Sequence, residues 1–179
     1  KRKKKKKKTR RDDELSFTAE ESEIAAKQTL ENANLNSSDI DADIVSAANL
    51  QRAYPAIAIE VQNELGIEGF AYDMMVGCSA STFGINNAYC DVKSGKSSKV
   101  LVISPEITSG HNNFKNRDGH FIFGDICTAV VIEKNSQSKN KFKILDTKLK
   151  TSFSNNIRNN YGYMNAVEDK EYTESELLF

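Results

Sequence analysis

YDMMVGCSASTFG, running from Tyr72 to Gly84, joins an apolar segment to a series of small residues, and Cys78 lies at the junction. The β-favouring FAYDMM before it predicts a strand, and the sequence from Ser79 onward predicts a helix. The N-terminus of a helix favours the thiolate form of a cysteine, and the cysteine's own N–H would point toward the oxygen of an attacked carbonyl group. Cysteine is also a common small packing residue in protein cores. The residues alone leave both interpretations of Cys78 open.

Helices and strands are expected to alternate on both sides of this junction. A capping-box sequence at 18–21 and Pro55 each predict the start of a helix, and the second helix keeps an apolar face until Gly66 ends it. A third helix, buried on several faces, runs from Ser79 to Gly95. Strands are expected at 43–48, 70–75, 99–104, 127–133 and, more weakly, 142–149, with 99–104 and 127–133 buried on both faces. This order predicts an α/β fold with a mostly parallel sheet between helices.

The totals describe an ordinary domain of 179 residues with 25 acidic and 25 basic side chains. This balance predicts no nucleic-acid partner. The lysine-rich stretch 1–11 is interpreted as a solvated tail or an artefact of the gene sequence, because it has no aromatic side chain that could stack on bases. No apolar run approaches the roughly 20 residues that cross a bilayer, so no membrane association is expected.

The three cysteines and two histidines predict neither a disulfide framework nor a metal site. The cysteines lack CxxC spacing, which favours a reducing, cytoplasmic compartment. Cys90 within the third helix and Cys127 at the start of a strand are interpreted as packing residues. His111 and His120 have no nearby carboxylate pattern and are interpreted as surface or loop-ordering residues.

Four separated motifs resemble one known family. AYPAIAIEVQNELGI, FAYDMMVGCSASTFG, NRDGHFIFGD and TAVVIE follow the order and spacing of the 3-oxoacyl-ACP synthase III enzymes, which have the thiolase fold. The resemblance extends from Leu15 to Leu149 and implies the N-terminal part of that two-half fold. On this basis, a basic tail is expected at 1–11, a thiolase-like N-terminal domain at 12–167, and the start of a connection to a missing C-terminal half at 168–179.

The resemblance also assigns candidate site residues, with Cys78 as the nucleophile. It places Tyr54 where the family has an aromatic residue that closes the partner subunit's acyl pocket, Arg117 at the mouth of the pantetheine tunnel, and Phe123 in the pocket lining. Each of these three also has a simpler interpretation: Tyr54 could pack against the helix start, Arg117 could form a solvated ion pair, and Phe123 could belong to the core. The chain reads FGDI where the family usually has FGDG, which removes a glycine from the local turn.

The resemblance implies a condensing reaction that uses no cofactor. An acyl group passes from acyl-CoA to Cys78 and then condenses with malonyl-ACP, giving 3-oxoacyl-ACP and carbon dioxide. The family's decarboxylating histidine and asparagine match no position here, so the chain alone is expected to be catalytically incomplete. Two alternatives stay open, namely a thiolase-fold acyltransferase that makes an ester or amide, and a non-catalytic thiolase-fold subunit, although such subunits typically lack the cysteine.

The implied partners are acyl-CoA, acyl carrier protein and a second copy of the chain. The resemblance implies a homodimer that forms through the strand at 99–104. An apolar strand at an exposed sheet edge favours association, so the isolated chain is expected to be insoluble or associated.

Overall fold

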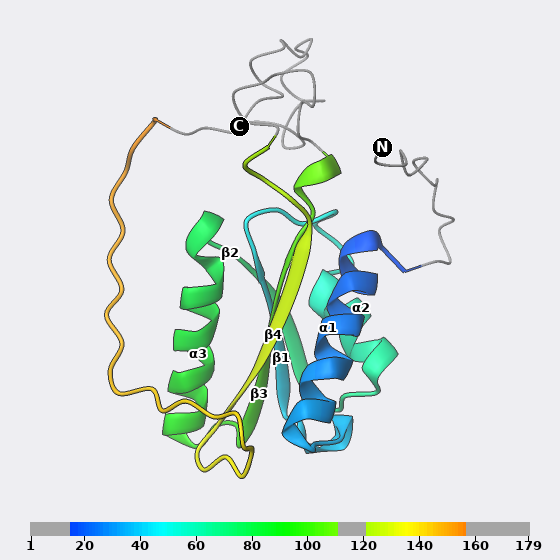
Figure 1. Cartoon of the computed structure of the whole chain (residues 1–179), viewed down its shortest axis with the longest axis vertical. Helices are drawn as coiled ribbons and strands as arrows, with labels where there is room; N and C mark the ends of the chain where they lie inside the picture. The colour runs from blue at the N-terminus through cyan, green and yellow to red at the C-terminus, as the bar shows by residue number, and fades with distance from the viewer. Residues whose placement is uncertain (1–14, 111–120, 157–179) are drawn as a thin grey trace.

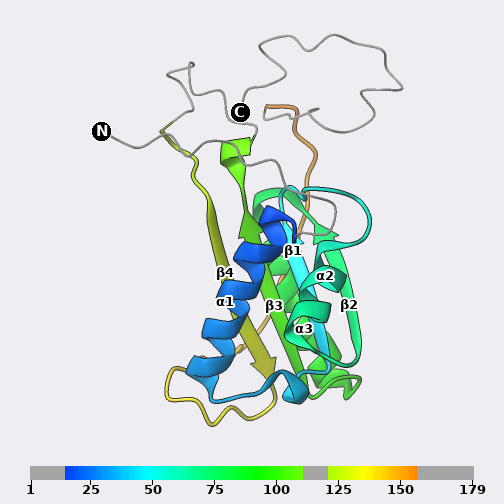
Figure 2. The same ribbon diagram turned by 90° about the vertical axis from the view of Figure 1, so that its right-hand side faces the viewer.

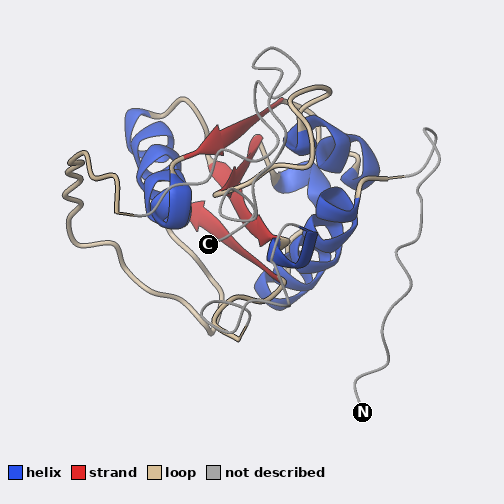
Figure 3. Cartoon of the chain, turned by 90° about the horizontal axis from the view of Figure 1, so that it is seen from above, coloured by secondary structure: helices blue, strands red, loops and turns tan. Residues whose placement is uncertain are grey.

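The computed structural model describes residues 15–110 and 121–156. A four-stranded sheet lies between α1 (Phe17–Ala33) and α2 (Ile57–Leu65) on one face and α3 (Ala80–Ser94) on the other (Figure 1, Figure 3). The strands, in the spatial order β2-β1-β3-β4, are β1 (Ala42–Ala47), β2 (Phe70–Met75), β3 (Lys99–Glu106) and β4 (Ile126–Glu133). β1 runs parallel to β2 and β3, whereas β4 is antiparallel to β3. The predicted α/β fold with a mostly parallel sheet is confirmed.

Short 3₁₀ turns complete the described elements: η1 (Ser37–Asp39), η2 (Gly77–Ser79) and η3 (Thr108–Gly110). Within residues 15–110 and 121–156, every helix is too short or too polar to span a bilayer.

Two apolar clusters hold the three layers together. The first lies between the sheet and α1 and α2 and includes Val45, Leu101 and Ile103 of the sheet. The second lies under α3 and includes Ile44 and Val102. Successive side chains of β1 and β3 therefore enter opposite clusters, as the two-residue period of a strand requires. β1 is buried along its whole length because it has a strand on each side and helices on both faces.

The starts of α1 and α2 differ from the predicted positions. The Oγ of Ser16 accepts a hydrogen bond from the backbone N–H of Ala19 at 3.1 Å, so Ser16 is the N-cap of α1 and the capping box predicted at 18–21 lies inside the helix. α2 begins at Ile57, and Pro55 therefore precedes the helix instead of occupying its first turn. In both cases the predicted helix is present and only its start was misplaced.

The glycines predicted to end α2 and α3 do so. Gly66 follows α2 with a φ of 67°, and Gly95 follows α3 with a φ of 80°. These left-handed conformations are strained for residues with a Cβ, so glycine is the residue that suits both positions.

β3 is an interior strand, which corrects one expectation from the sequence. It pairs with β1 on one side and with β4 on the other, and residues 100–103 are buried. The edges of the sheet are β2 and β4. The strand at 99–104 is therefore not free to pair with a second copy, and the argument that its exposure makes the isolated chain associate is wrong.

The C-terminal part of the described chain is more exposed than predicted. Burial alternates along β4, because this strand lies at the sheet edge and only Cys127, Ala129 and Val131 pack against the first cluster. Its predicted burial on both faces is wrong. The weak strand predicted at 142–149 is also wrong, since this segment has no regular secondary structure and Phe142 and Leu145 are exposed (Figure 1).

α3 lies close against the sheet along one stripe of small residues. Ala80, Gly84 and Ala88 are the buried residues of α3, as their spacing predicted. A Cβ on Gly84 would collide with the Oγ of Ser46 in β1. The rest of α3 is half-buried or exposed, and Cys90 is exposed, so the predictions of a helix buried on several faces and of Cys90 as a packing residue are wrong for the described structure. The close contact at Gly84 allows α3 to lie close to β1, and Cys78 lies directly before this helix.

Candidate functional site

Cys78 lies in the turn between β2 and α3. It is the middle residue of η2 (Gly77–Ser79), directly before α3 begins, and it is exposed. Gly77 reaches a φ of 54°, and the Oγ of Ser79 donates a hydrogen bond to the carbonyl oxygen of Val76 at 3.1 Å. The predicted position at a strand-to-helix junction is confirmed, with one 3₁₀ turn between the two elements. Its exposure disfavours the interpretation of Cys78 as a core packing residue.

The other two cysteines lie in settings that suit a nucleophile less well. Cys127, at the start of β4, packs against the first cluster. Burial raises the pKa of the Cys127 thiol to about 11; the nearby Ser22 hydroxyl acts in the opposite direction, and the charge of Glu21 raises the pKa further. A thiol with such a pKa is protonated at neutral pH, which agrees with the predicted packing role of Cys127. Cys90 is exposed, but it lies within α3 and not at the start of a helix.

The sheet brings the candidate residues to one end of the molecule. The carboxyl ends of the parallel strands β1, β2 and β3 meet at the same edge, which is the upper end in Figure 1. The loop after β1 carries Tyr54, and η2 after β2 carries Cys78. β4 is antiparallel and starts at this same edge, where Ile126 lies opposite Glu106, so Phe123 also lies there. Arg117, His111 and His120 lie outside the described residues.

Tyr54 and Phe123 differ in exposure. The side chain of Tyr54 is 86% exposed, whereas that of Phe123 is 38% exposed. A large aromatic side chain that protrudes this far does not pack against the start of α2, so the simpler interpretation of Tyr54 is not supported. Phe123 is too exposed to belong to the core of the described chain.

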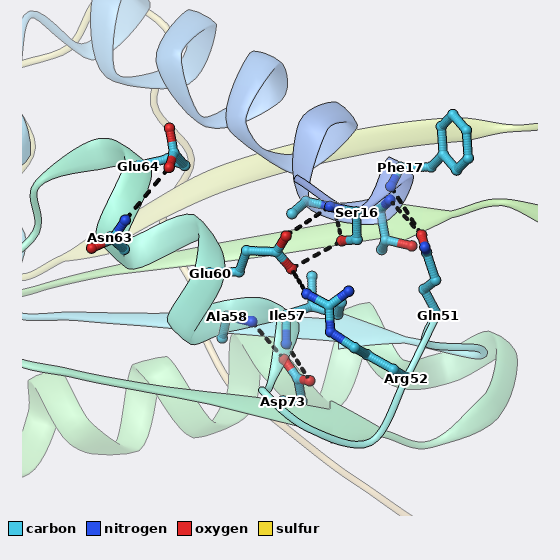
Figure 4. Close-up of polar contacts among 12 residues, drawn as sticks. Ser16, Phe17, Gln51, Arg52, Ile57, Ala58, Glu60, Asn63, Glu64 and Asp73 are labelled. Atoms are coloured by element: carbon cyan, nitrogen blue, oxygen red, sulfur yellow. Dashed lines mark hydrogen bonds and ion pairs between the residues drawn. The ribbon is translucent and has the colours of Figure 1, made fainter. Parts of the chain in front are cut away.

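Three carboxylates that the sequence analysis did not single out hold the surrounding loops. Glu106 ends β3. Asp73 lies in the middle of β2 and Glu60 in the first turn of α2, as Figure 4 shows. The Asp73 carboxylate accepts the backbone N–H groups of Ile57 and Ala58, each at 2.8 Å, and so caps α2 from a neighbouring strand. One sequence signal was available: an aspartate in the apolar strand FAYDMM needs a polar partner when it is half-buried.

Burial also raises the pKa of two of the acidic side chains in the sheet. The pKa of Asp43 in β1 is raised to about 8, mainly by burial and further by the charge of Asp73. Burial raises the pKa of Asp73 as well, while its hydrogen bonds to the N–H groups of Ala58 and Ile57 and the charge of Arg52 act in the opposite direction. Asp43 lies in the core and not at the strand ends where the candidate site residues lie. Its protonation therefore affects the stability of the fold more than catalysis at that site.

Structural comparison defines the class of protein. The fold is similar to the crystal structure of 3-oxoacyl-[acyl-carrier-protein] synthase III from Aquifex aeolicus, with a TM-score of 0.64 and 30% sequence identity over 68% of this chain and 40% of that chain. The corresponding enzyme from Thermus thermophilus gives a TM-score of 0.62 and 28% identity over 71% of this chain and 39% of that chain. The chain therefore has a thiolase-type fold.

Sequence comparison then shows which family the chain is similar to. The family model for 3-oxoacyl-[acyl-carrier-protein (ACP)] synthase III matches residues 72–152. The beta-ketodecanoyl-[acyl-carrier-protein] synthase of Pseudomonas aeruginosa is 48% identical over 169 residues, which cover 93% of this chain and 48% of that protein. The beta-ketoacyl-[acyl-carrier-protein] synthase III of Agrobacterium fabrum is 38% identical over 117 residues, 65% of this chain and 36% of that protein. The chain is similar to the 3-oxoacyl-ACP synthase III family and spans about half the length, or less, of these curated relatives.

Proposed function

We propose that this chain carries the acyl-accepting cysteine of a condensing enzyme of fatty-acid or related acyl-chain synthesis. The exposed position of Cys78 at the carboxyl end of the sheet, directly before α3, is the observation that carries the proposal. The similarity of the chain to the 3-oxoacyl-ACP synthase III family supports it. The enzyme would be an acyltransferase of the 3-oxoacyl-ACP synthase III type.

In the first step the Cys78 thiolate attacks the thioester carbonyl of acyl-CoA. A tetrahedral oxyanion forms, and it collapses to an acyl-S-Cys78 thioester as the CoA thiolate leaves and takes up a proton. The position before α3 favours this step, because N–H groups at the start of a helix stabilise both the attacking thiolate and the oxyanion.

In the second step malonyl-ACP loses carbon dioxide, and the resulting carbanion attacks the acyl-S-Cys78 carbonyl. The products are 3-oxoacyl-ACP and the free Cys78 thiol. The carbanion needs hydrogen-bond donors, and neither histidine of this sequence matches the family's decarboxylating histidine. We therefore assign this step to the whole protein and not to these 179 residues alone.

The remaining site residues and partners follow from the family. Tyr54 closes the acyl pocket of a partner subunit, Phe123 lines the pocket and Arg117 binds CoA or ACP phosphates. The protein acts as a cytoplasmic homodimer with acyl carrier protein and acyl-CoA as partners and without a cofactor. Because β3 is interior, the subunit contact is assigned to another surface than the strand at 99–104.

The relative from Pseudomonas aeruginosa suggests the acyl donor. A ketodecanoyl product contains ten carbons, of which two come from the malonyl unit, so the matching acyl donor has eight carbons. We propose octanoyl-CoA as a substrate on this basis.

Acylation of Cys78 is tested by mass spectrometry on the full-length protein incubated with octanoyl-CoA. We expect one octanoyl group on the peptide that contains Cys78, and no adduct in Cys78→Ala. Cys90→Ala is the matched control, since Cys90 is also exposed, and it should be acylated like the wild type. Absence of an adduct, or an adduct on Cys90 instead, refutes the proposal. Release of carbon dioxide from malonyl-ACP then separates the condensing enzyme from an acyltransferase that makes an ester or amide.

A further inference from the structure

The connection between β1 and α2 is tied down along its length although it contains no regular secondary structure. We call residues 48–56 the Tyr54 loop. At its start, the backbone N–H of Ala48 donates to Glu106 Oε2 at 3.0 Å, and the side-chain amide of Asn49 donates to Glu106 Oε1 at 3.3 Å. Glu106 ends β3, so the first residues of the loop are held by the strand next to β1.

The middle of the Tyr54 loop is held by the start of α1. The side-chain oxygen of Gln51 accepts the backbone N–H of Phe17 at 2.9 Å (Figure 4). The Arg52 guanidinium forms an ion pair with Glu60. The Glu60 carboxylate also accepts hydrogen bonds from the backbone N–H of Ser16 at 2.7 Å and from the Ser16 hydroxyl group at 3.0 Å. Glu60 therefore joins three elements, which are α2 that carries it, the start of α1 and the Tyr54 loop.

The environment of Glu60 makes these contacts strong. Its side chain is 13% exposed and that of Arg52 is 33% exposed. Hydrogen bonds between ionised groups that are partly removed from water are about twice as strong as neutral ones. Replacing Glu60 by a neutral residue would remove the carboxylate with which Arg52 forms its ion pair and weaken the link between the loop and the two helices.

The end of the Tyr54 loop is held by hydrogen bonds to β2, the strand that leads to Cys78. Asp73 of β2 caps the N-terminus of α2 through the N–H groups of Ile57 and Ala58, which directly follow the loop. β2 continues into η2, the turn that contains Cys78. The same strand therefore fixes both the end of the Tyr54 loop and the start of the cysteine turn.

Tyr54 itself is 86% exposed in this otherwise fastened loop. Connecting loops are usually more mobile than the elements they join, and an aromatic side chain on a mobile loop would lose entropy each time it packed against a ligand or partner. Fastening the backbone on both sides of Tyr54 removes much of that cost before any contact forms.

We propose that Glu60 and Arg52 are positioning residues for Tyr54 and thereby set the acyl-chain selectivity of the enzyme. The inference rests on the proposed function, in which Tyr54 closes an acyl pocket. Glu60 and Arg52 act through the Tyr54 loop and not on the substrate. A rigidly held tyrosine bounds the length of the acyl chain, whereas a loosened one accepts longer chains.

The test compares kcat/KM for octanoyl-CoA and dodecanoyl-CoA in the full-length protein. We expect Glu60→Gln to lower the preference for octanoyl-CoA about tenfold, because small displacements of positioning groups have effects of this size or larger. Glu64→Gln is the matched control on the same helix, since the exposed Glu64 has one polar contact among the described residues, at 3.5 Å to the adjacent Asn63. The donor preference of this variant should not change. Arg52→Lys keeps the positive charge but loses the planar guanidinium group. It should lower the preference for octanoyl-CoA as well, by a smaller factor than Glu60→Gln does.

A second comparison separates positioning of Tyr54 from general damage. Tyr54→Ala should lower the preference as well, and adding Glu60→Gln to Tyr54→Ala should change it no further. A general structural role would instead slow both acyl-CoA donors equally and leave their ratio unchanged. If Glu60→Gln is poorly folded by circular dichroism, the comparison is made with Arg52→Lys alone.

The outcomes also separate this inference from the proposed function. Failure of Cys78 to accept an octanoyl group overturns the proposed function. Normal acylation of Cys78, combined with an unchanged donor ratio in Glu60→Gln or Arg52→Lys, overturns only the positioning role. If Glu60→Gln changes the donor ratio by the same factor in the wild type and in Tyr54→Ala, the positioning role is also overturned.

Discussion

Asp43 is a fully buried carboxyl group in the middle of the sheet, and it should make the stability of the protein depend on pH. Its side chain lies on the same face of β1 as Val45, toward α1 and α2. Neither carboxyl oxygen has a hydrogen-bond partner among the described residues. Burial, with a further contribution from the charge of Asp73, raises the pKa of Asp43 from 3.8 to about 8, so this carboxyl group is protonated at pH 7.

The direction in which stability changes with pH follows from the higher pKa of Asp43 in the folded state. The folded protein holds the Asp43 proton more tightly than the unfolded chain does, so protonation stabilises the fold fully below the unfolded pKa of 3.8. That contribution is lost as the pH rises from there through the folded pKa of about 8. One pKa unit corresponds to about 1.4 kcal/mol, so raising the pH from 5 to 8 should lower the free energy of unfolding by about 4 kcal/mol.

Urea denaturation of the wild type and Asp43→Asn at pH 5 and pH 8 measures this effect. The asparagine does not titrate, so the stability of the wild type relative to Asp43→Asn should fall by about 4 kcal/mol between the two pH values. Glu68→Gln, at an exposed position, is the control and should show the pH dependence of the wild type. An equal difference between wild type and Asp43→Asn at both pH values would refute the raised pKa.

Two further predictions concern packing. Gly84→Ala should destabilise the protein by about 1–3 kcal/mol in urea denaturation, because the new methyl group collides with Ser46 and pushes α3 away from the sheet. Acylation of Cys78, measured on the folded fraction, should also become slower. An unchanged stability would show that α3 can shift without cost. Leu101→Ala should lower the free energy of unfolding by about 2–5 kcal/mol, because this side chain is fully buried. Leu145→Ala, at an 83% exposed position, should change it by less than about 0.5 kcal/mol. Similar losses of stability in both variants would contradict the described core.

Helices and their ends were predictable from the sequence because their signals are local. The buried residues Ile57, Val61 and Leu65 repeat at the interval of a helix, and Gly66 supplies the left-handed residue that ends it. The strand before Cys78 and the small residues after it also lie in one short stretch. The position of the candidate nucleophile could therefore be predicted without knowledge of the fold.

Strand environments were less predictable because they depend on distant partners. The apolar sequence of β3 is compatible with an edge or an interior position, and only its pairing with both β1 and β4 decides between them. The segment 142–149 has an alternating pattern but no neighbouring strand among the described residues, so the pattern alone did not produce a strand. Cys90 lies in a helix whose outer side is uncovered in the described structure, which its local sequence does not indicate.

The carboxylates around the Tyr54 loop were missed for the same reason. Ser16 and Glu60 are 44 residues apart in sequence, and Ala48 and Glu106 are 58 residues apart. A glutamate in the first turn of a helix or at the end of a strand has an ordinary local role at each position. Only the tertiary fold shows that these two side chains hold one loop.

The packing of α1 against β4 constrains how the protein can assemble during synthesis. α1 lies beside β4 (Figure 2). The hydroxyl group of Thr29 in α1 donates to the carbonyl oxygen of Ala129 in β4 at 3.1 Å, and the two residues are 100 positions apart. α1 also packs against α2 and β3, so β4 completes a cover that these earlier elements begin. Until β4 has emerged from the ribosome, the side of α1 that faces this strand stays exposed, and a pause in translation before that point would prolong the exposure.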